Sequence, residues 1–101
     1  MIKHVVFFKL IDPTRDNLEK SRDILLNMRG KIEQLREMEV GIDITRSKRS
    51  FDLMLFTKFE SLGDLDDYIR HPIHITAQKH LSPLVELSNT VDYEYETSEK
   101  H

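Results

Sequence analysis

Two segments of this chain carry apolar side chains in both phases of a β-strand, and this pattern limits the fold more than any other feature. The first segment has Ile2, His4, Val6, Phe8 and Leu10 in one phase and Val5 and Phe7 in the other. The second segment, residues 51–59, has Leu53 and Leu55 in one phase and Met54 and Phe56 in the other. A strand that is apolar on both sides needs cover on both faces of its sheet. The fold must therefore supply two covering layers.

A long helix is predicted between these two strands. Asp12 is a favourable N-cap, and Pro13 suits the first helical position because the N–H that it lacks has no helical partner. Residues suited to one buried helix face then recur every three or four positions: Leu18, Ser21, Leu25, Met28, Ile32 and Leu35. Gly30 weakens a helix by no more than about 1 kcal/mol, so we expect the helix to continue through it.

Short strands and helices are predicted for the rest of the chain. The alternation Val40, Ile42, Ile44 predicts a second strand, and the polar residues 46–50 predict a hairpin loop before the strand 51–59. Ser61 and Asp64 match a capping box at the start of a helix with the apolar face Leu62, Leu65 and Ile69. Pro72 interrupts this helix, and a second helical piece is expected from there toward Leu81. Residues 90–97 alternate apolar side chains with acids, which is typical of a last strand.

This order of elements, βαββαβ, predicts an α+β protein with the ferredoxin-like fold, in which a four-stranded antiparallel sheet carries its helices on one face. We expect one domain over residues 1–97 and a frayed polar tail over residues 98–101. The second face of the sheet then stays apolar and uncovered. We therefore predict a homodimer through this open sheet face, with the two sheets closing an α/β barrel. The alternative is a monomer whose second face is half polar.

Composition excludes several classes of function. The 101 residues contain no cysteine, so disulfides and thiolate metal sites are ruled out. The 18 acidic residues outnumber the 15 basic ones, which argues against a nucleic-acid partner. The longest apolar runs span four residues and no secretory signal is visible, so we expect no membrane partner and a cytoplasmic protein.

Histidines are concentrated in one short segment. Tyr68, His71 and His74 follow one another at three-residue steps and share one side if helical geometry continues past Pro72. His4 stands in the first strand, in phase with apolar neighbours. Imidazole gains or loses a proton near neutral pH, so these side chains are candidates for acid–base chemistry.

These features resemble the stress-responsive dimeric α/β-barrel (Dabb) family over nearly the whole chain. The resemblance rests on the opening MIKHVVFFK, on the segment from Phe51 to Ser61 with Phe-Glu-Ser at its end, and on the segment Tyr68-Ile69-Arg70-His71-Pro72-Ile73-His74. It implies a ferredoxin-like subunit, a barrel formed by two chains, and a stress-response protein of unknown function, because most members have no assigned reaction.

The resemblance also implies roles for individual residues. In a plant relative that is a polyketide cyclase, the catalytic tyrosine and histidine fall on Tyr68 and His74, and a supporting histidine falls on His4. A further cavity histidine of that cyclase falls on Leu53, so this chain departs from the cyclase pattern there.

Three functions are open at this stage. The first is binding of a small apolar or aromatic ligand in the barrel cavity, which we expect His71, Leu53, Phe8 and Val6 to line. The second is a cofactor-independent lyase or cyclase, with His74 as the base and Tyr68 as the donor to an enolate oxygen. The third is a purely structural dimer.

Each candidate residue also has a structural interpretation. His71 suits a helix cap beside Pro72, and Tyr68, His74 and His4 can each hydrogen-bond the backbone inside a core. No metal site is predicted, because a His-x-x-His pair across a proline chelates poorly. No cofactor is expected. The basic loop 46–49 is interpreted as a solvated hairpin tip and not as a phosphate site.

Overall fold

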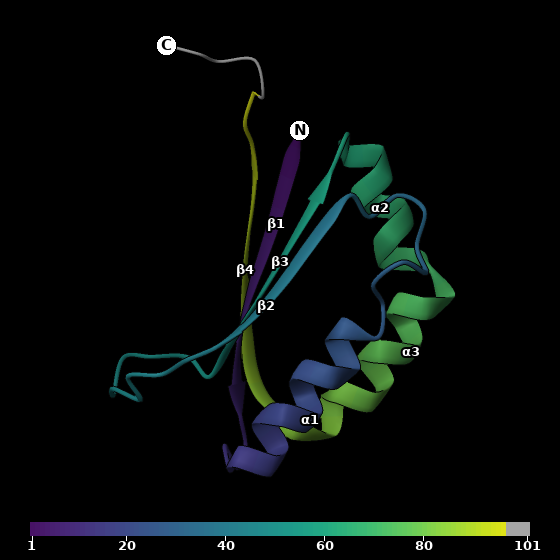
Figure 1. The fold of residues 1–101 in the computed structure, drawn as a ribbon. Coiled ribbons are helices and arrows are strands. Elements are labelled where there is room, and N and C mark those ends of the chain that lie inside the picture. The colour runs from purple at the N-terminus through teal and green to yellow at the C-terminus, as the bar shows by residue number, and fades with distance from the viewer. Residues whose placement is uncertain (97–101) are drawn as a thin grey trace.

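The computed structural model describes residues 1–96 of the chain as one four-stranded antiparallel sheet with helices on one side. In chain order the elements are β1 (Ile2–Leu10), α1 (Arg15–Leu26), β2 (Glu37–Ile42), β3 (Leu53–Phe59), α2 (Leu62–Arg70), α3 (Pro72–Leu81), the 3-10 turn η1 (Ser82–Leu84) and β4 (Val85–Glu94). The strand order is β2-β3-β1-β4. Figure 1 shows all three helices on the same face of this sheet. The predicted ferredoxin-like α+β fold is confirmed.

Antiparallel pairing assigns each residue of β1 to one face of the sheet. His4, Val6 and Phe8 lie opposite Thr57, Leu55 and Leu53 of β3. All six of these residues are buried, because their side chains point toward the helices. Directly paired residues share a face, so the residues between them point the other way. The core therefore lies between the sheet and its helices.

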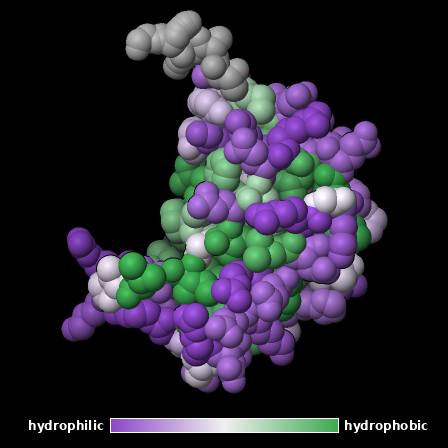
Figure 2. Space-filling model, in the orientation of Figure 1, coloured by the Kyte–Doolittle hydropathy of each residue, from purple (hydrophilic) through white to green (hydrophobic). Residues whose placement is uncertain are grey.

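The other face of the sheet has no cover within the described part of the chain. Phe7 of β1 is 37% exposed, and Leu87, Val91 and Tyr93 of β4 are 49%, 56% and 45% exposed. Figure 2 shows apolar atoms, drawn in green, along the side of the sheet that the helices leave bare. We refer to this surface as the open face.

The first helix is shorter than its apolar stripe predicts. It ends at Leu26 rather than continuing to Leu35, and the chain then passes through turns in which Gly30 adopts φ +78°. Met28 and Ile32 are nonetheless buried in the core. The left-handed backbone at Gly30 turns the chain, and a residue without Cβ adopts it at no steric cost.

Several element boundaries also differ from prediction. Thr14, and not Asp12, caps α1, because the backbone N–H of Asn17 donates to the Thr14 hydroxyl at 3.1 Å. Strand β2 begins at Glu37 instead of near residue 40. Strand β4 begins at Val85 and not at residue 90, and the end predicted for it, residue 97, lies outside the described residues, as does the predicted tail 98–101.

The capping predicted at the second helix is present. The backbone N–H of Asp64 donates to the Ser61 hydroxyl at 3.1 Å, and α2 begins at the next residue after this serine. The predicted second helical piece is α3, which begins at Pro72 and ends at Leu81.

Substitution of Gly30 by alanine tests where the first helix ends. In a continuous helix this change would raise the free energy of unfolding by about 1 kcal/mol. At the observed positive φ it instead lowers that free energy by about 1–2 kcal/mol, and the cost is conformational because a Cβ at this site meets no atom within 4 Å.

Urea denaturation measures this difference. Gly63→Ala, inside helix α2 and with only an ordinary 3.7 Å contact for the added Cβ, is the matched control and increases stability. A stabilised Gly30→Ala protein would show that the helix continues past Leu26.

Candidate functional site

A cavity of about 220 Å³ lies between the sheet and helices α2 and α3, on the β4 side of the molecule. Residues of the sheet, of all three helices and of the turn after α1 line it: His4, Val6, Phe8, Leu25, Met28, Leu55, Tyr68, Ile69, His74, Ala77, Gln78, Leu81, Ser88 and Thr90. Five of the seven side chains singled out from the sequence are in this set, namely His4, Val6, Phe8, Tyr68 and His74. Residues far apart in the sequence thus meet in one cavity.

The other two predicted residues do not line this cavity. Leu53 lies at the start of β3, where it is buried in the core and borders a different hollow on the sheet. His71 is the N-cap of α3, and its Nδ1 accepts a hydrogen bond from the backbone N–H of Ile73 at 3.0 Å. Its ring therefore satisfies a free donor at the start of the helix, which is the structural role that the adjacent proline indicated.

His74 is held by the carbonyl of the preceding helix. Its Nδ1 lies 3.0 Å from the backbone oxygen of Ile69. Because a carbonyl oxygen only accepts hydrogen bonds, Nδ1 carries the proton, and Nε2 of the neutral ring is left as an acceptor. Burial lowers the pKa of His74, the Ile69 carbonyl opposes this shift, and the nearby His4 and His71 add to the lowering. The ring is thus kept as a neutral base.

Tyr68 is completely buried between the sheet and the helices. Its ring centroid lies 4.9 Å from that of Phe59, 4.5 Å from that of His74 and 6.1 Å from that of His4. Within residues 1–96 its hydroxyl has no hydrogen-bond partner. Burial raises the pKa of this phenol strongly, so it stays protonated and can donate a hydrogen bond.

His4 is paired with an acidic residue that the sequence reasoning did not single out. The β1–β4 register places Asp92 opposite His4, and Nδ1–H of the histidine donates to Asp92 Oδ1 at 2.5 Å. This contact fixes the orientation of the His4 ring at the cavity wall. In a ferredoxin-like sheet the last strand lies beside the first. This topology was the only sequence-level indication that an acidic residue of the last strand could contact His4.

The mouth of the cavity is lined by exposed side chains. Ile69 and Gln78 come from the helices, and Ser88 and Thr90 come from β4. Sequence reasoning missed Ser88 because it began this strand at residue 90, and it placed Thr90 at the start of the strand without assigning it to the site. The volume is below the roughly 300–1,000 Å³ of sites for drug-sized molecules, so the single chain offers room for a compact ligand.

In chemical terms, the site brings a neutral imidazole acceptor and a phenol donor together between apolar walls. Such a pair can bind a molecule that has both a donor and an acceptor, and it can move a proton at a carbonyl compound. Across residues 1–96 no three histidine, aspartate or glutamate side chains are grouped in a way that holds a metal ion. None of the described helices has the length and apolar character needed to cross a bilayer.

The fold and this cavity define a ferredoxin-like protein with a small internal site between its sheet and helices. The chain belongs to the stress responsive A/B barrel domain (Dabb) family, whose model matches residues 2–95. The family resemblance read from the sequence is thereby confirmed.

Solved structures show the same architecture. A dimeric protein of unknown function from Bacteroides fragilis is 29% identical, with a TM-score of 0.80 and coverage of 93% of this chain and 95% of that one. A Dabb family protein from Mesorhizobium loti is 23% identical, with a TM-score of 0.73 and coverage of 93% and 95%. A hydroxynitrile lyase from Passiflora edulis is 15% identical, with a TM-score of 0.80 and coverage of 98% and 96%. No curated protein matches this chain.

The lowered pKa of His74 predicts a pH dependence of stability. The unfolded chain binds a proton at this residue near its ordinary pKa of about 6.5, and the folded chain binds it only at lower pH. The histidine therefore favours the folded state above the unfolded pKa, and this contribution is lost as the pH falls through the folded pKa. We expect His74→Gln to lose less stability than the parent protein between about pH 8 and about pH 5.

Urea denaturation at several pH values measures this difference. The outer-surface variant His80→Gln serves as the control. We expect its free energy of unfolding to change with pH as that of the parent protein does. Equal slopes for the parent and His74→Gln would contradict the lowered pKa.

Proposed function

We propose that the cavity at His4, Tyr68 and His74 binds a small, mainly apolar molecule that carries an oxygen atom. The observation that supports this most strongly is the buried Tyr68 hydroxyl, which has no hydrogen-bond partner within the described chain. A buried donor left unpaired costs about 1–3 kcal/mol, and a ligand oxygen removes that cost. The Nε2 acceptor of His74 suits the hydroxyl hydrogen of the same ligand.

The residues that line the cavity indicate the polarity and the size of the ligand. Val6, Phe8 and Leu55 of the sheet face Leu25 and Met28 of the first helix and its following turn, so the body of the ligand is apolar. The volume of about 220 Å³ favours a molecule of the size of one aromatic ring.

Phenol is a suitable probe for this site. We expect it to shift the backbone amide resonances of residues around the cavity in an NMR titration, and Tyr68→Phe to weaken binding about tenfold, because one buried hydrogen bond is lost. Tyr93→Phe on the open face is the matched control and leaves the affinity unchanged. The removed hydroxyl has no partner, so the variant folds normally. Equal affinities of Tyr68→Phe and the parent would exclude this mode of binding.

A second candidate function is a cofactor-independent lyase or cyclase. The geometry of His74 favours it, because the hydrogen bond to Ile69 presents Nε2 as a base next to the phenol of Tyr68. Nε2 would take a proton from the ligand, and the tyrosine would stabilise the oxygen on which charge develops. Turnover distinguishes the two functions, since a binding protein shows none and an enzyme loses it in His74→Ala.

We also propose that two copies of the chain associate through the open face and form an α/β barrel. Exposed apolar side chains on β1 and β4 support this, with Phe7 and Val91 near the middle of their strands. Similar proteins from Bacteroides fragilis and Thermobifida fusca are described as dimeric. A second sheet would supply the cover that the apolar open face lacks.

A charge placed on the open face tests this dimer. We expect the parent protein to have about twice the 12.0 kDa mass of one chain in light scattering, and Val91→Asp to have the mass of one chain, because the dimer would bury an unpaired carboxylate. Ile75→Asp, at a comparably exposed position on α3, keeps the mass of the parent. A Val91→Asp protein that stays dimeric would locate the interface elsewhere.

A further inference from the structure

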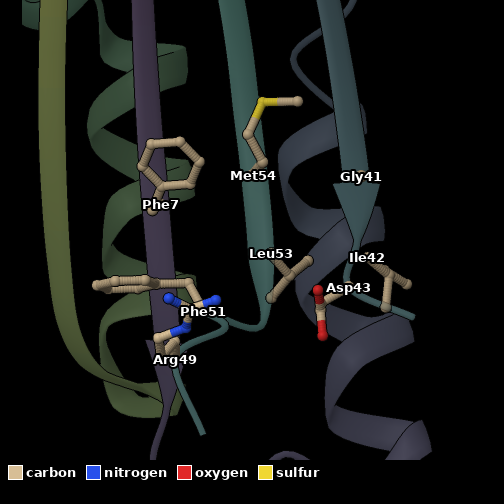
Figure 3. A pocket seen from close by; sticks show the side chains of 8 residues that line it. All are labelled: Phe7, Gly41, Ile42, Asp43, Arg49, Phe51, Leu53 and Met54. Carbon is tan, nitrogen blue, oxygen red and sulfur yellow. The ribbon is translucent and has the colours of Figure 1, made fainter. Parts of the chain in front are cut away.

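A second, larger hollow lies on the opposite side of the sheet from the His4 cavity. It has a volume of about 470 Å³ and is lined by Phe7, Gly41, Ile42, Asp43, Arg49, Phe51, Leu53 and Met54. Figure 3 shows Phe7, Phe51 and Met54 in front of the sheet, with the helices behind it. The hollow is thus on the open face, at the base of the loop that joins β2 to β3.

The walls of this hollow are apolar and aromatic. Phe7 of β1 and Phe51 of the loop lie with their ring centroids 6.0 Å apart, and Met54 of β3 lies beside Phe7 in the paired register. Gly41 of β2, which is paired with Met54, contributes no side chain there. A Cβ added at Gly41 would lie 4.0 Å from the Met54 methyl carbon, so the glycine keeps this part of the hollow open.

The two charged residues at the hollow differ in their partners. Asp43 is already engaged, because its Oδ2 accepts the backbone N–H of Arg46 at 2.6 Å and its Oδ1 lies 3.4 Å from the Thr45 hydroxyl. No acidic side chain within residues 1–96 pairs with Arg49. Figure 3 shows the Arg49 guanidinium next to the Phe51 side chain. The available charge at the hollow is therefore positive.

We propose that this hollow binds a small carboxylate with an aromatic or branched apolar body. The body would pack against Phe7, Phe51 and Met54, and the carboxylate would accept two parallel hydrogen bonds from the Arg49 guanidinium. The volume of about 470 Å³ is in the range of small-molecule sites. This site is independent of the His4 cavity, because the sheet separates the two.

The position of the hollow links it to the proposed dimer. A second chain on the open face would enclose a ligand held there, so the ligand and the partner chain would be in contact. The binding experiment therefore uses the full chain in the association state that it has in solution, and the stoichiometry is measured together with the affinity.

Phenylacetate is the probe, and 2-phenylethanol, which has the same ring but no charge, is the comparison ligand. We expect calorimetry to show that phenylacetate binds more tightly to the parent protein than 2-phenylethanol does. Arg49→Gln weakens phenylacetate binding about tenfold or more, since a charge-assisted pair is lost, and leaves 2-phenylethanol nearly unaffected. Lys48→Gln, the same charge change one residue away, is the matched control and keeps the parent affinity.

Two further variants separate this site from the His4 cavity and from a folding defect. Gly41→Val fills the hollow at a strand position that favours a β-branched residue, and abolishes phenylacetate binding while the chain stays folded. Tyr68→Phe leaves phenylacetate binding unchanged, because it alters only the other cavity.

Three results would overturn the proposal. One is equal affinity for the charged and the neutral ligand, and another is equal weakening by Arg49→Gln and Lys48→Gln. The third is the absence of phenylacetate binding to the parent protein, which would indicate that a side chain of the second copy occupies the hollow.

Discussion

Strand β1 must be covered on both faces, and this requirement organises the whole molecule. It lies in the middle of the sheet, between β3 and β4, so its backbone is paired on both edges. One set of alternate side chains packs under the helices and forms the core. The other set, with Phe7 at its centre, faces the side that no described element covers. The core, the internal cavity and the open face are thus all consequences of one apolar strand in a central position.

The fold class could be predicted from the sequence because the strongest patterns belong to central elements. Strands β1 and β3 are apolar in both phases, and Ser61 and Pro72 mark the starts of α2 and α3. The end of α1 could not be predicted in the same way. Met28 and Ile32 are buried at helical spacing although they lie in turns, so periodicity alone does not reveal the positive φ of Gly30. The early half of β4 is exposed and lacks a clear alternation, which hid its start.

The candidate site was only partly visible in the sequence. Three-residue spacing and family resemblance brought Tyr68 and His74 together with His4, and the structure places all three around one cavity. Asp92 could not be assigned, because it is 88 residues from His4 in the sequence and their contact depends on the register between β1 and β4. The unpaired state of the Tyr68 hydroxyl is likewise a property of the packed interior, and no local pattern encodes it.

The pleat of β1 has a consequence for how this family member can change over evolutionary time. Val6 and Phe8 line the internal cavity, whereas Phe7, the residue between them, lines the hollow on the open face. Adjacent codons thus specify residues that line different compartments. A missense change at Phe7 alters the hollow on the open face and leaves the Val6 and Phe8 side chains of the internal cavity unchanged. A one-codon insertion or deletion within the strand has the opposite effect, because it exchanges the residues that face the two sides. Point substitutions can therefore tune the two compartments separately, while length changes in β1 disrupt both at once.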